Sequence, residues 1–376
     1  MKKNVKGTNM NIKVEYKNSD GKFNGFLKKM GGKKVSVLCD YNTRPFADKI
    51  IADMEDAGAT SVLIYFDDKD LIPDEKVEAV SLANAKGTDY LLAVGSGSLN
   101  DMGKCVSTKL NIPCGCLATA ASMDGYCSKG SAIMRGGFKV TDVVHTPEDV
   151  LIDADIIKTA PKLMTASGFG DIVGKFTCLT DWELAHIIKG EPINVKAFRM
   201  MEDARTKTMD AFEDLTEYKP KAIETLMDAL IMAGISMAEC GNSRPASGSE
   251  HHMSHFLEMD FVRRGERVPL HGVKVAIGTL ISIEIYNYIK DNKIRFVGAE
   301  EVYKLVDKLP KVETVKSMLM RMGCPVRFSE IGVRKETFLE MVEKAHTVRD
   351  RYTVLTLASE LGLNEKLKPI LSEKYF

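Results

Sequence analysis

The sequence has no excess of charge of either sign. Lysine and arginine together number 52, aspartate and glutamate together also number 52, and the formal net charge is zero. A nucleic-acid-binding protein that relies on bulk positive charge is therefore not indicated, and neither is a polybasic membrane-surface protein. We expect no nucleic-acid partner.

Long hydrophobic runs are also lacking. The most apolar stretch begins at Val275 and is interrupted by Glu284, so it is shorter than the roughly 20 apolar residues that a membrane-spanning helix needs. Residues 1–22 are polar, and no apolar segment follows the first lysines, which does not match a secretory signal. We expect no membrane span.

The eight cysteines form no C-x-x-C motif. Only Cys114 and Cys116 are close together, and no second pair of cysteines or histidines accompanies them as in a zinc site. We therefore expect reduced thiols in a cytoplasmic protein, with this pair inside a buried strand.

The first 160 of the 376 residues alternate between strand-like and helix-like segments. Strands separated by helices of about 10 to 15 residues indicate βαβ units and a parallel sheet. Residues 161–376 have a mostly helical pattern, and the last ten residues are expected to form an exposed tail. We predict a Rossmann-like α/β domain over 1–160 and an all-α domain over 161–376. The predicted strands are 33–40, 61–66, 89–94 and 113–118.

A glycine-containing turn, Gly95-Ser96-Gly97-Ser98, follows the third predicted strand. Glycines let a backbone approach a phosphate closely, and a helix N-terminus presents free N–H groups to an anion. The strict dinucleotide motif G-x-G-x-x-G is not met, because Asn100 occupies the position of the third glycine. The turn is thus either a phosphate-binding loop or an ordinary turn before a capped helix.

Polar side chains also follow the fourth and first predicted strands. The loop 119–128 contains the hydroxyls of Thr119, Ser122 and Ser128 and the carboxylate of Asp124, and Asp40 ends the first strand. Ligands of open α/β sheets bind at these strand ends, where an acidic residue accepts ribose hydroxyls. The hydroxyls are candidates for cofactor contacts, and Asp124 for a sugar or polyol hydroxyl. A surface loop and a turn-starting aspartate are the alternatives.

The histidines are concentrated in one segment. Four of the seven, at positions 251, 252, 255 and 271, lie within 21 positions. His251 and His255 are four residues apart and share one helix face, and His271 begins another apolar helix. Two imidazoles and one carboxylate suit Zn²⁺, Fe²⁺ or Ni²⁺. A histidine cluster without function is the alternative.

Asp171 is the candidate carboxylate for this site. It lies in GFGDIVGK (168–175), which is not a Walker A loop because Phe169 and Phe176 stand where that motif needs glycine and Ser or Thr. The alternative for an aspartate in such a segment is a helix cap.

The motifs together resemble one family. The chain resembles the sn-glycerol-1-phosphate dehydrogenases, especially their bacterial branch, within the superfamily of iron-type alcohol dehydrogenases, glycerol dehydrogenases and dehydroquinate synthases. The resemblance extends over nearly the whole chain and implies a dehydroquinate synthase-like fold. The motifs that carry it are GSGSLND (95–101), TAASMDGYCS (119–128), GFGDIVGK (168–175), SRPASGSEHHMSHFLEM (243–259), LHGVKVAIGTL (270–280) and RDRYTVL (349–355).

The resemblance implies a metal ion held by Asp171, His251 and His271. His251 is preferred to His252, because the family places its metal histidine four residues before a second functional histidine. Zn²⁺ is the expected metal, with Ni²⁺ or Fe²⁺ as alternatives, because the same ligands serve all three.

The resemblance also implies the substrate and cofactor contacts. Asp124, Asp171 and His255 are expected at the substrate, with Lys129, Lys175 or Arg244 as candidate anchors for its phosphate. NAD(H) or NADP(H) is the expected cofactor, bound by domain 1–160, while domain 161–376 binds metal and substrate. The residues expected to hold the cofactor are Asp40, Gly95, Ser96, Gly97, Ser98, Thr119, Ala120, Ala121, Ser122 and Ser128.

The implied activity is the reversible, metal-dependent reduction of dihydroxyacetone phosphate to sn-glycerol 1-phosphate with NAD(P)H. We expect this activity in a cytoplasmic homo-oligomer, a dimer or larger, that serves phospholipid biosynthesis. The alternatives are a glycerol or polyol dehydrogenase of the same fold that acts on an unphosphorylated substrate, and a catalytically silent protein that binds nucleotide or sugar phosphate.

Overall fold

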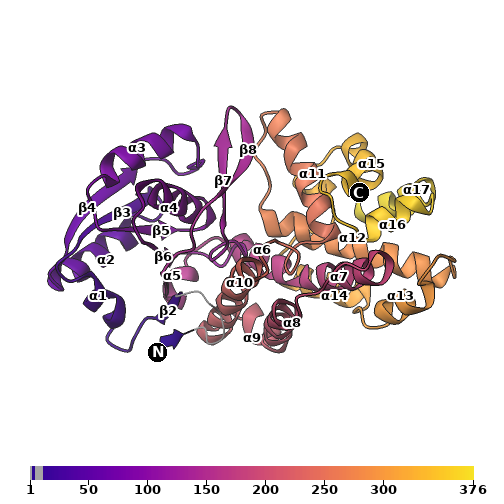
Figure 1. The fold of residues 1–376 in the computed structure, drawn as a ribbon, viewed down its shortest axis with the longest axis horizontal. Helices are drawn as coiled ribbons and strands as arrows, with labels where there is room; N and C mark the ends of the chain where they lie inside the picture. The colour runs from indigo at the N-terminus through magenta and orange to yellow at the C-terminus, as the bar shows by residue number, and fades with distance from the viewer. Residues whose placement is uncertain (1, 5–11) are drawn as a thin grey trace. The chain divides into compact units, whose positions relative to one another are not determined.

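The structure, a computed structural model, describes residues 2–4 and 12–376 and divides into two compact units (Figure 1). The first unit contains the residues up to Ala121, Gly125–Pro161 and Tyr218–Met227. The second contains Ser122–Asp124, Lys162–Glu217 and Asp228–Phe376. The chain thus contributes three residues to the second unit before it completes the first.

The first unit is built on a seven-stranded sheet in the order β1-β2-β9-β6-β5-β3-β4. Among the described strands of this sheet, β1 alone is antiparallel to its neighbour, and the other six run parallel. The four predicted strands are present as β3 to β6, so the predicted parallel sheet is confirmed. The strands are β1 (Lys2–Asn4), β2 (Lys13–Tyr16), β3 (Lys34–Asp40), β4 (Thr60–Phe66), β5 (Tyr90–Gly95), β6 (Cys114–Ala118) and β9 (Asp149–Ile152).

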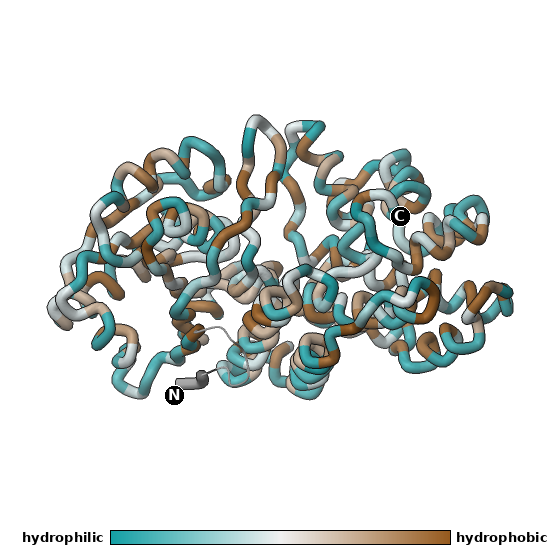
Figure 2. Tube along the Cα trace, viewed as in Figure 1, coloured by the Kyte–Doolittle hydropathy of each residue, from teal (hydrophilic) through white to brown (hydrophobic). Residues whose placement is uncertain are grey.

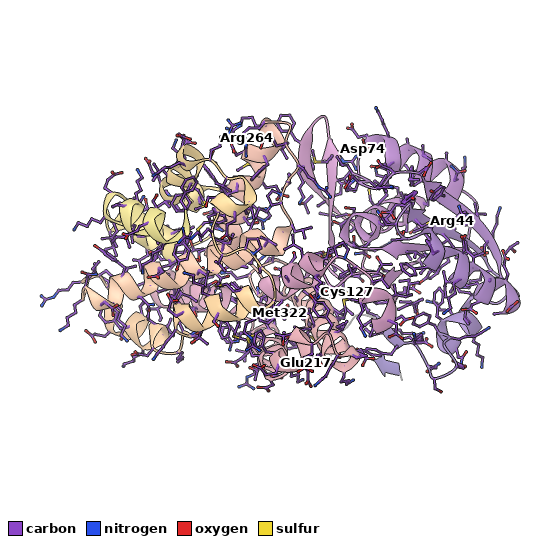
Figure 3. All side chains as sticks on the ribbon, turned by 180° about the vertical axis from the view of Figure 1, so that it is seen from behind. Arg44, Asp74, Cys127, Glu217, Arg264 and Met322 are labelled. Carbon is purple, nitrogen blue, oxygen red and sulfur yellow. The ribbon has the colours of Figure 1, made fainter. Side chains whose placement is uncertain are left out.

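Helices cover both faces of this sheet. α1 (Asn24–Met30) and α2 (Arg44–Asp56) share a core with one face, and α3 (Glu75–Ala85) and α4 (Gly97–Leu110) share a core with the other. β5 and β6 are buried along their whole length, as expected for strands covered on both sides. Asp74, labelled in Figure 3, caps α3 by accepting bonds from two backbone amides.

The sheet reverses its winding between β3 and β5. From β3 the chain passes through α2 to β4 on one side, and from β5 it passes through α4 to β6 on the other. Ligands of doubly wound sheets bind at such a switch point, outside the carboxyl ends of the strands. Asp40 and Gly95 are the last residues of these two strands.

The sequence did not predict β2, β9 or the hairpin of β7 (Gly130–Arg135) and β8 (Phe138–Val143). β2 and β9 have four residues each, which is too short for a clear periodic pattern. The hairpin turn, Gly136-Gly137, has positive φ at both residues, and a Gly-Gly pair between two strand-like runs is the signal that would have revealed it.

The second unit is helical, as predicted, and α5 (Ala154–Ile157) precedes it. The segment 161–189 at the start of this unit forms two helices that meet at Gly174. Figure 2 shows hydrophobic and hydrophilic residues alternating along helices such as α13, as expected where one face is buried. No helix over the described residues is long and apolar enough to cross a membrane. The helices are α6 (Lys162–Val173), α7 (Lys175–Lys189), α8 (Val195–Asp210), α9 (Phe212–Thr216), α10 (Pro220–Cys240, shared by both units), α11 (Ser249–Arg263), α12 (His271–Asp291), α13 (Ala299–Val306), α14 (Val312–Arg321), α15 (Lys335–Lys344), α16 (Val354–Glu360) and α17 (Asn364–Tyr375), with short 3₁₀ turns at Ser329–Ile331 and Ala345–Thr347.

The prediction of an exposed C-terminal tail is wrong. These residues belong to α17, which buries Leu367, Leu371 and Tyr375. Their spacing of four residues places them on one face of the helix, and this apolar face packs onto the unit.

α6 and α12 approach each other through facing glycines. A Cβ built on Gly272 would lie 1.8 Å from the carbonyl oxygen of Ser167, and one built on Gly170 would lie 2.5 Å from the carbonyl oxygen of Gly272. Asp171 follows Gly170 in α6, and His271 precedes Gly272 in α12. The close contact therefore brings this aspartate and this histidine together.

We expect Gly272→Ala to destabilise the second unit, because the added methyl group has no space between the two helices. Overpacking a core costs about 1–3 kcal/mol or more, which lowers the melting temperature of a unit of this size by roughly 4–10 °C. Scanning calorimetry measures the change. Gly190→Ala is the control, since a Cβ there meets no atom within 4 Å and only its left-handed backbone opposes the change. Equal stability of the two variants would contradict the close packing.

Candidate active site

Three side chains from three helices converge inside the second unit. Asp171 comes from α6, His251 from α11 and His271 from the start of α12, and one ligand atom of each lies within 4.8 Å of the others. Nε2 of His251 is 3.5 Å from Oδ1 of Asp171. The rings of the two histidines have centroids 5.0 Å apart.

The chemistry of this group suits a divalent metal ion. Asp171 is fully buried, and its Oδ1 atom has no hydrogen-bond partner among the described residues. Burial alone would raise the pKa of Asp171, but the Lys175 ammonium group and the two histidines hold that pKa below its usual range. Burial lowers the pKa of His271 well below its usual value, so that this ring is neutral. Burial also disfavours a charge on His251, but hydrogen bonds to Asp171 and Glu250 raise the pKa of that ring above its usual value. A bound Zn²⁺ or related ion would take the place of the proton on Nε2 of His251.

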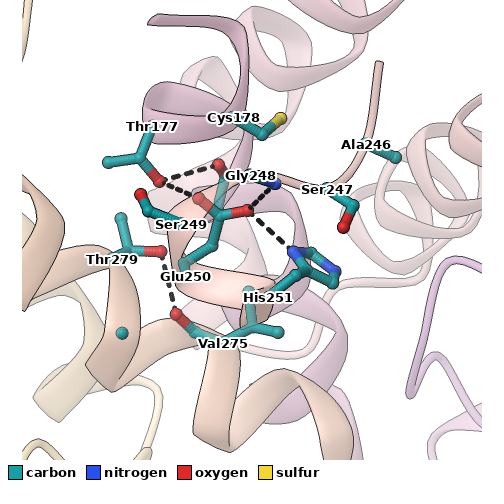
Figure 4. A network of polar contacts seen from close by, with 12 residues as sticks. Thr177, Cys178, Ala246, Ser247, Gly248, Ser249, Glu250, His251, Val275 and Thr279 are labelled. Carbon is teal, nitrogen blue, oxygen red and sulfur yellow. Dashed lines mark hydrogen bonds and ion pairs between the residues drawn. The ribbon is translucent and has the colours of Figure 1, made fainter. Parts of the chain in front are cut away.

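Glu250 orients the central histidine of this group (Figure 4). Its Oε1 atom is 2.7 Å from Nδ1 of His251 and accepts a bond from the amide of Gly248 at 2.6 Å, while Oε2 accepts from Oγ1 of Thr177 at 2.5 Å. A carboxylate beside Nδ1 fixes the proton there, which leaves Nε2 as the donor atom that faces Asp171.

The two adjacent histidines, His251 and His252, have different surroundings in the structure. The group of close ligand atoms contains the first and not the second. His252 is fully buried, and neither of its ring nitrogens has a hydrogen-bond partner within the described part of the chain. Burial is the main cause that lowers its pKa to about 3. The choice of His251 as ligand stays a prediction, which the position of its ring favours.

His255 lies next to this group, on the same face of α11 as His251. Its ring centroid is 6.3 Å from that of His251 and 5.9 Å from that of His271. Nη2 of Arg349 is 3.1 Å from Nε2 of His255, and Oε2 of Glu258 is 3.4 Å from its Nδ1. Because a guanidinium group only donates, Nε2 accepts and the neutral ring holds its proton on Nδ1.

Asp124 reaches the same place from the loop after β6. Its amide donates to Oδ2 of Asp171 at 3.0 Å, and its Oδ2 atom accepts from Nζ of Lys175 at 2.5 Å. Lys175 is fully buried and also donates to the carbonyl of Ala246 at 2.8 Å. This lysine is therefore engaged with carboxylates.

The helix-cap alternative for Asp171 is wrong. The residue lies inside α6, two positions before its end, and the GFGDIVGK segment has helical rather than loop structure. Its glycines serve helix packing, because the segment faces α12 at Gly170.

The glycine turn and the 119–128 loop meet at the carboxyl edge of the sheet of the first unit. Gly95 and Ala118 are opposite each other in β5 and β6, and the amide of Thr119 donates to the Gly95 carbonyl at 3.2 Å. α4 begins at Gly97, and Ser96 makes no side-chain capping bond to it. Other helices, such as α2 and α7, also lack a side-chain cap, so both alternatives for the turn stay open.

Other candidate cofactor residues have local partners. Oδ1 of Asp40 accepts from both the amide and Oγ1 of Thr43 at 2.9 Å, so the turn-forming alternative is present at the switch point. The hydroxyl of Ser128 donates to the carbonyls of Gly125 and Gly130. The carbonyl of Ser122, which belongs to the second unit, accepts from Oγ of Ser167 at 2.9 Å.

A second cluster of ligand-type side chains in the first unit is already neutralised. Glu78, Cys105 and Asp142 have close ligand atoms. Arg135 forms ion pairs with both carboxylates, and Lys109 pairs with Glu78. Burial raises the pKa of the Cys105 thiol to about 11. These cations take the place that a metal ion would need.

Comparison with known proteins assigns the chain to a family. A family model described as iron-containing alcohol dehydrogenase matches residues 15–161. A glycerol-1-phosphate dehydrogenase (NAD(P)+) of Bacillus licheniformis is 34% identical over 343 residues, which cover 90% of this chain and 86% of the relative. The chain belongs to the glycerol-1-phosphate dehydrogenase family. A member from Pyrococcus horikoshii is 35% identical over 75% of this chain and 74% of its own.

Solved structures show the same fold as this family member. A probable glycerol dehydrogenase from Sinorhizobium meliloti 1021 has a TM-score of 0.70 with 17% identity and covers 97% of this chain and 98% of its own. An iron-containing alcohol dehydrogenase from Thermococcus thioreducens also has a TM-score of 0.70, with 18% identity and coverage of 98% and 99%. The predicted fold class is confirmed.

Sequence reasoning about this glycerol-1-phosphate dehydrogenase family member missed two supporting carboxylates. Glu250 immediately precedes His251, and an acidic residue beside a candidate metal histidine was an available signal. Asp181 accepts from the amides of Ser249 and Val354 at 2.6 and 2.8 Å and from the hydroxyl of Tyr286 at 2.6 Å. These three partners are 68, 173 and 105 positions away in the sequence. No local sequence pattern could therefore have predicted that Asp181 binds them.

We expect Glu250→Gln to weaken metal binding, because the charge that raises the basicity of His251 is lost. Loss of such a supporting partner typically costs about 10- to 100-fold in metal affinity. Competition between the protein and a chelator for Zn²⁺ measures the change. Glu239→Gln is a matched control, since Glu239 pairs with Lys196 and is not part of the site. Equal affinities of the two variants would show that Glu250 does not support the site.

Proposed function

We propose that this protein catalyses the reversible, metal-dependent reduction of dihydroxyacetone phosphate to sn-glycerol 1-phosphate with NAD(P)H. The observation that carries the proposal is the buried group of Asp171, His251 and His271 in a chain that shares 34% identity with a glycerol-1-phosphate dehydrogenase. A catalytically silent relative would have no reason to keep such a complete ligand set.

Asp171, His251 and His271 would hold the metal ion, which we propose is Zn²⁺ rather than Ni²⁺ or Fe²⁺. When bound, a divalent ion supplies Lewis-acid polarisation of the substrate carbonyl. Glu250 keeps Nε2 of His251 directed toward Asp171 by holding Nδ1.

We propose that Asp124 and His255 contact the substrate next to Asp171. Lys175 holds one oxygen of Asp124, and the other oxygen would accept a substrate hydroxyl. His255, which holds its proton on Nδ1 in this structure, or a water beside it, would pass the proton that the C2 oxygen gains.

NAD(H) or NADP(H) would supply the hydride and bind at the switch point between β3 and β5. The N–H groups at the start of α4 would bind a pyrophosphate at Gly95–Ser98, and Thr119–Ser122 and Ser128 would complete the cofactor contacts. Asp40 favours NAD(H), because its carboxylate repels the 2′-phosphate of NADP(H). We therefore propose that domain 1–160 binds the dinucleotide and that domain 161–376 binds metal and substrate, together with Asp124.

We further propose a homo-oligomer in the cytoplasm with a role in phospholipid biosynthesis. All eight cysteines are free thiols, and seven of them are buried. Such unpaired thiols are typical of a reducing compartment.

We expect the metal-loaded protein to oxidise NADH with dihydroxyacetone phosphate and not with unphosphorylated dihydroxyacetone. The protein is stripped of metal, reloaded with Zn²⁺ or Ni²⁺ and followed by NADH absorbance, and chiral analysis identifies the product enantiomer. Turnover of the unphosphorylated ketone alone would assign the protein to the polyol dehydrogenases instead. Binding of metal and nucleotide without any turnover would favour the silent binding protein.

We also expect His251→Ala and His252→Ala to differ. The first removes a ligand, so the metal content falls from about one ion per chain to nearly zero and turnover falls by at least roughly 10³-fold. The second removes a ring outside the ligand group and leaves the metal content near that of the unmodified protein. Elemental analysis of folded protein measures both. Metal loss in His252→Ala alone would move the ligand to that residue.

A further inference from the structure

Two half-buried arginines, Arg349 and Arg351, lie side by side next to His255. Arg349 donates to Nε2 of His255 and to Oγ of Ser243, both at 3.1 Å. Arg351 donates to the same Oγ atom at 2.8 Å and to the carbonyl of Ser247 at 3.2 Å. The hydroxyl of Ser243 thus bridges the two guanidinium groups and holds them together.

The carboxylates nearest to these two charges, Glu258 for Arg349 and Glu191 for Arg351, act on them from beyond ion-pair distance. Over residues 2–4 and 12–376, neither guanidinium group forms an ion pair with a carboxylate. Burial lowers the pKa of both groups, and the positive charge of Arg349 is a further cause that lowers the pKa of Arg351 to about 10. Like charges that are partly removed from water are costly unless an opposite charge joins them.

Arg244 shows what a structural arginine looks like in the same region. Its Nε and Nη2 atoms form a two-pronged contact with Glu191 at 2.9 and 2.8 Å. Nη2 also donates to the carbonyl of Tyr352 at 2.9 Å. Arg244 is therefore neutralised and holds in place the segment that carries the other two arginines.

Two further polar side chains of this cluster lack partners. Oγ of Ser247, whose own carbonyl accepts from Arg351, is buried without a hydrogen bond among the described residues. Both ring nitrogens of His252 also lack a hydrogen-bond partner among the described residues. The positive charges of Arg349 and Arg351 contribute to lowering the pKa of this ring. Figure 4 shows Ser247 in the loop that leads into α11. Buried polar atoms without partners in a native structure call for a ligand or ordered water.

We propose that Arg349 and Arg351 bind the phosphate group of the substrate. This assignment rests on the proposed function and specifies how the site selects a phosphorylated ketone. A planar guanidinium group binds phosphate oxygens through paired N–H donors. In dihydroxyacetone phosphate one methylene group and one ester oxygen separate C2 from phosphorus, so the phosphate anchor has to lie close to the ligand group of Asp171, His251 and His271.

The position of the arginines meets this requirement. Arg349 contacts His255, whose ring is adjacent to those of His251 and His271. Of the earlier candidates, Lys175 and Arg244 are engaged with carboxylates. An unphosphorylated ketone would leave both guanidinium groups without an ion pair among the described residues, so the same pair would disfavour it.

The test uses the full-length, Zn²⁺-loaded protein with Arg349→Met, Arg351→Met and Arg351→Lys. We expect the KM for dihydroxyacetone phosphate to rise roughly 10- to 100-fold in each methionine variant, with unchanged metal content, and competitive inhibition by inorganic phosphate to weaken in parallel. The KM of Arg351→Lys is expected to lie between that of the unmodified protein and that of Arg351→Met, because a lysine keeps the positive charge but lacks the paired N–H donors of a guanidinium group. Arg205→Met is the matched control, since Arg205 is also half-buried but stacks on Phe176 in another part of the unit.

The outcomes separate this inference from the proposed function. Failure of the unmodified protein to reduce dihydroxyacetone phosphate would refute the function itself. Normal turnover by that protein, with unchanged KM and phosphate inhibition in both methionine variants, would overturn only the phosphate anchor.

A measurement on the unmodified protein covers the case in which a variant fails to fold. Phenylglyoxal modifies accessible arginines, and mass spectrometry of the peptides locates the modified side chains. Inorganic phosphate should slow modification at Arg349 and Arg351 and leave Arg205 unaffected. Equal rates with and without phosphate at both positions would refute the anchor.

Discussion

The close contact between α6 and α12 is the constraint on which the site depends. Asp171 and His271 are neighbours because Gly170 and Gly272 allow the two backbones to touch. α11 approaches α12 in the same way, since a Cβ built on Gly278 would lie 2.9 Å from the carbonyl oxygen of Glu250. Three helix backbones held by packing leave little freedom to the side chains between them. The geometry of the ligand group is thus set by steric contact before any ion is bound.

Charge is the second constraint on this group. Asp124, Asp171 and Glu250 are buried together with Lys175. Burial and the neighbouring Asp171 raise the pKa of Asp124, and hydrogen bonds to Asp171 and Glu250 raise the pKa of His251 despite its burial. Without a metal ion, protons on such groups offset part of the negative charge that burial disfavours. A bound divalent cation would take over this role, and Oδ1 of Asp171, which accepts no hydrogen bond among the described residues, is available as a ligand.

The sequence was most informative where the signal was local. The strands β3 to β6, the turn after β5 and the pairing of His251 with His255 follow from short periodic patterns, which tertiary packing did not override. Contacts between residues far apart in the sequence could not be predicted from such local patterns. Glu250 was adjacent to a known candidate, whereas Asp181 and the arginines at 349 and 351 act on residues about 70 to 170 positions away. The cap assigned to Asp171 as an alternative failed because a glycine-rich segment also serves close helix packing.

The two charge clusters of the second unit explain together how one substrate would be oriented. The first gathers the carboxylates around Asp171 and would take a divalent cation. The second has two guanidinium groups, at Arg349 and Arg351, that form no ion pair among the described residues, and it suits a phosphate dianion. His255 touches the second cluster and borders the first. A ketone with a phosphate one carbon away from its carbonyl satisfies both clusters in only one orientation. The selectivity for a phosphorylated substrate and the direction in which its carbonyl points would then have a single electrostatic cause.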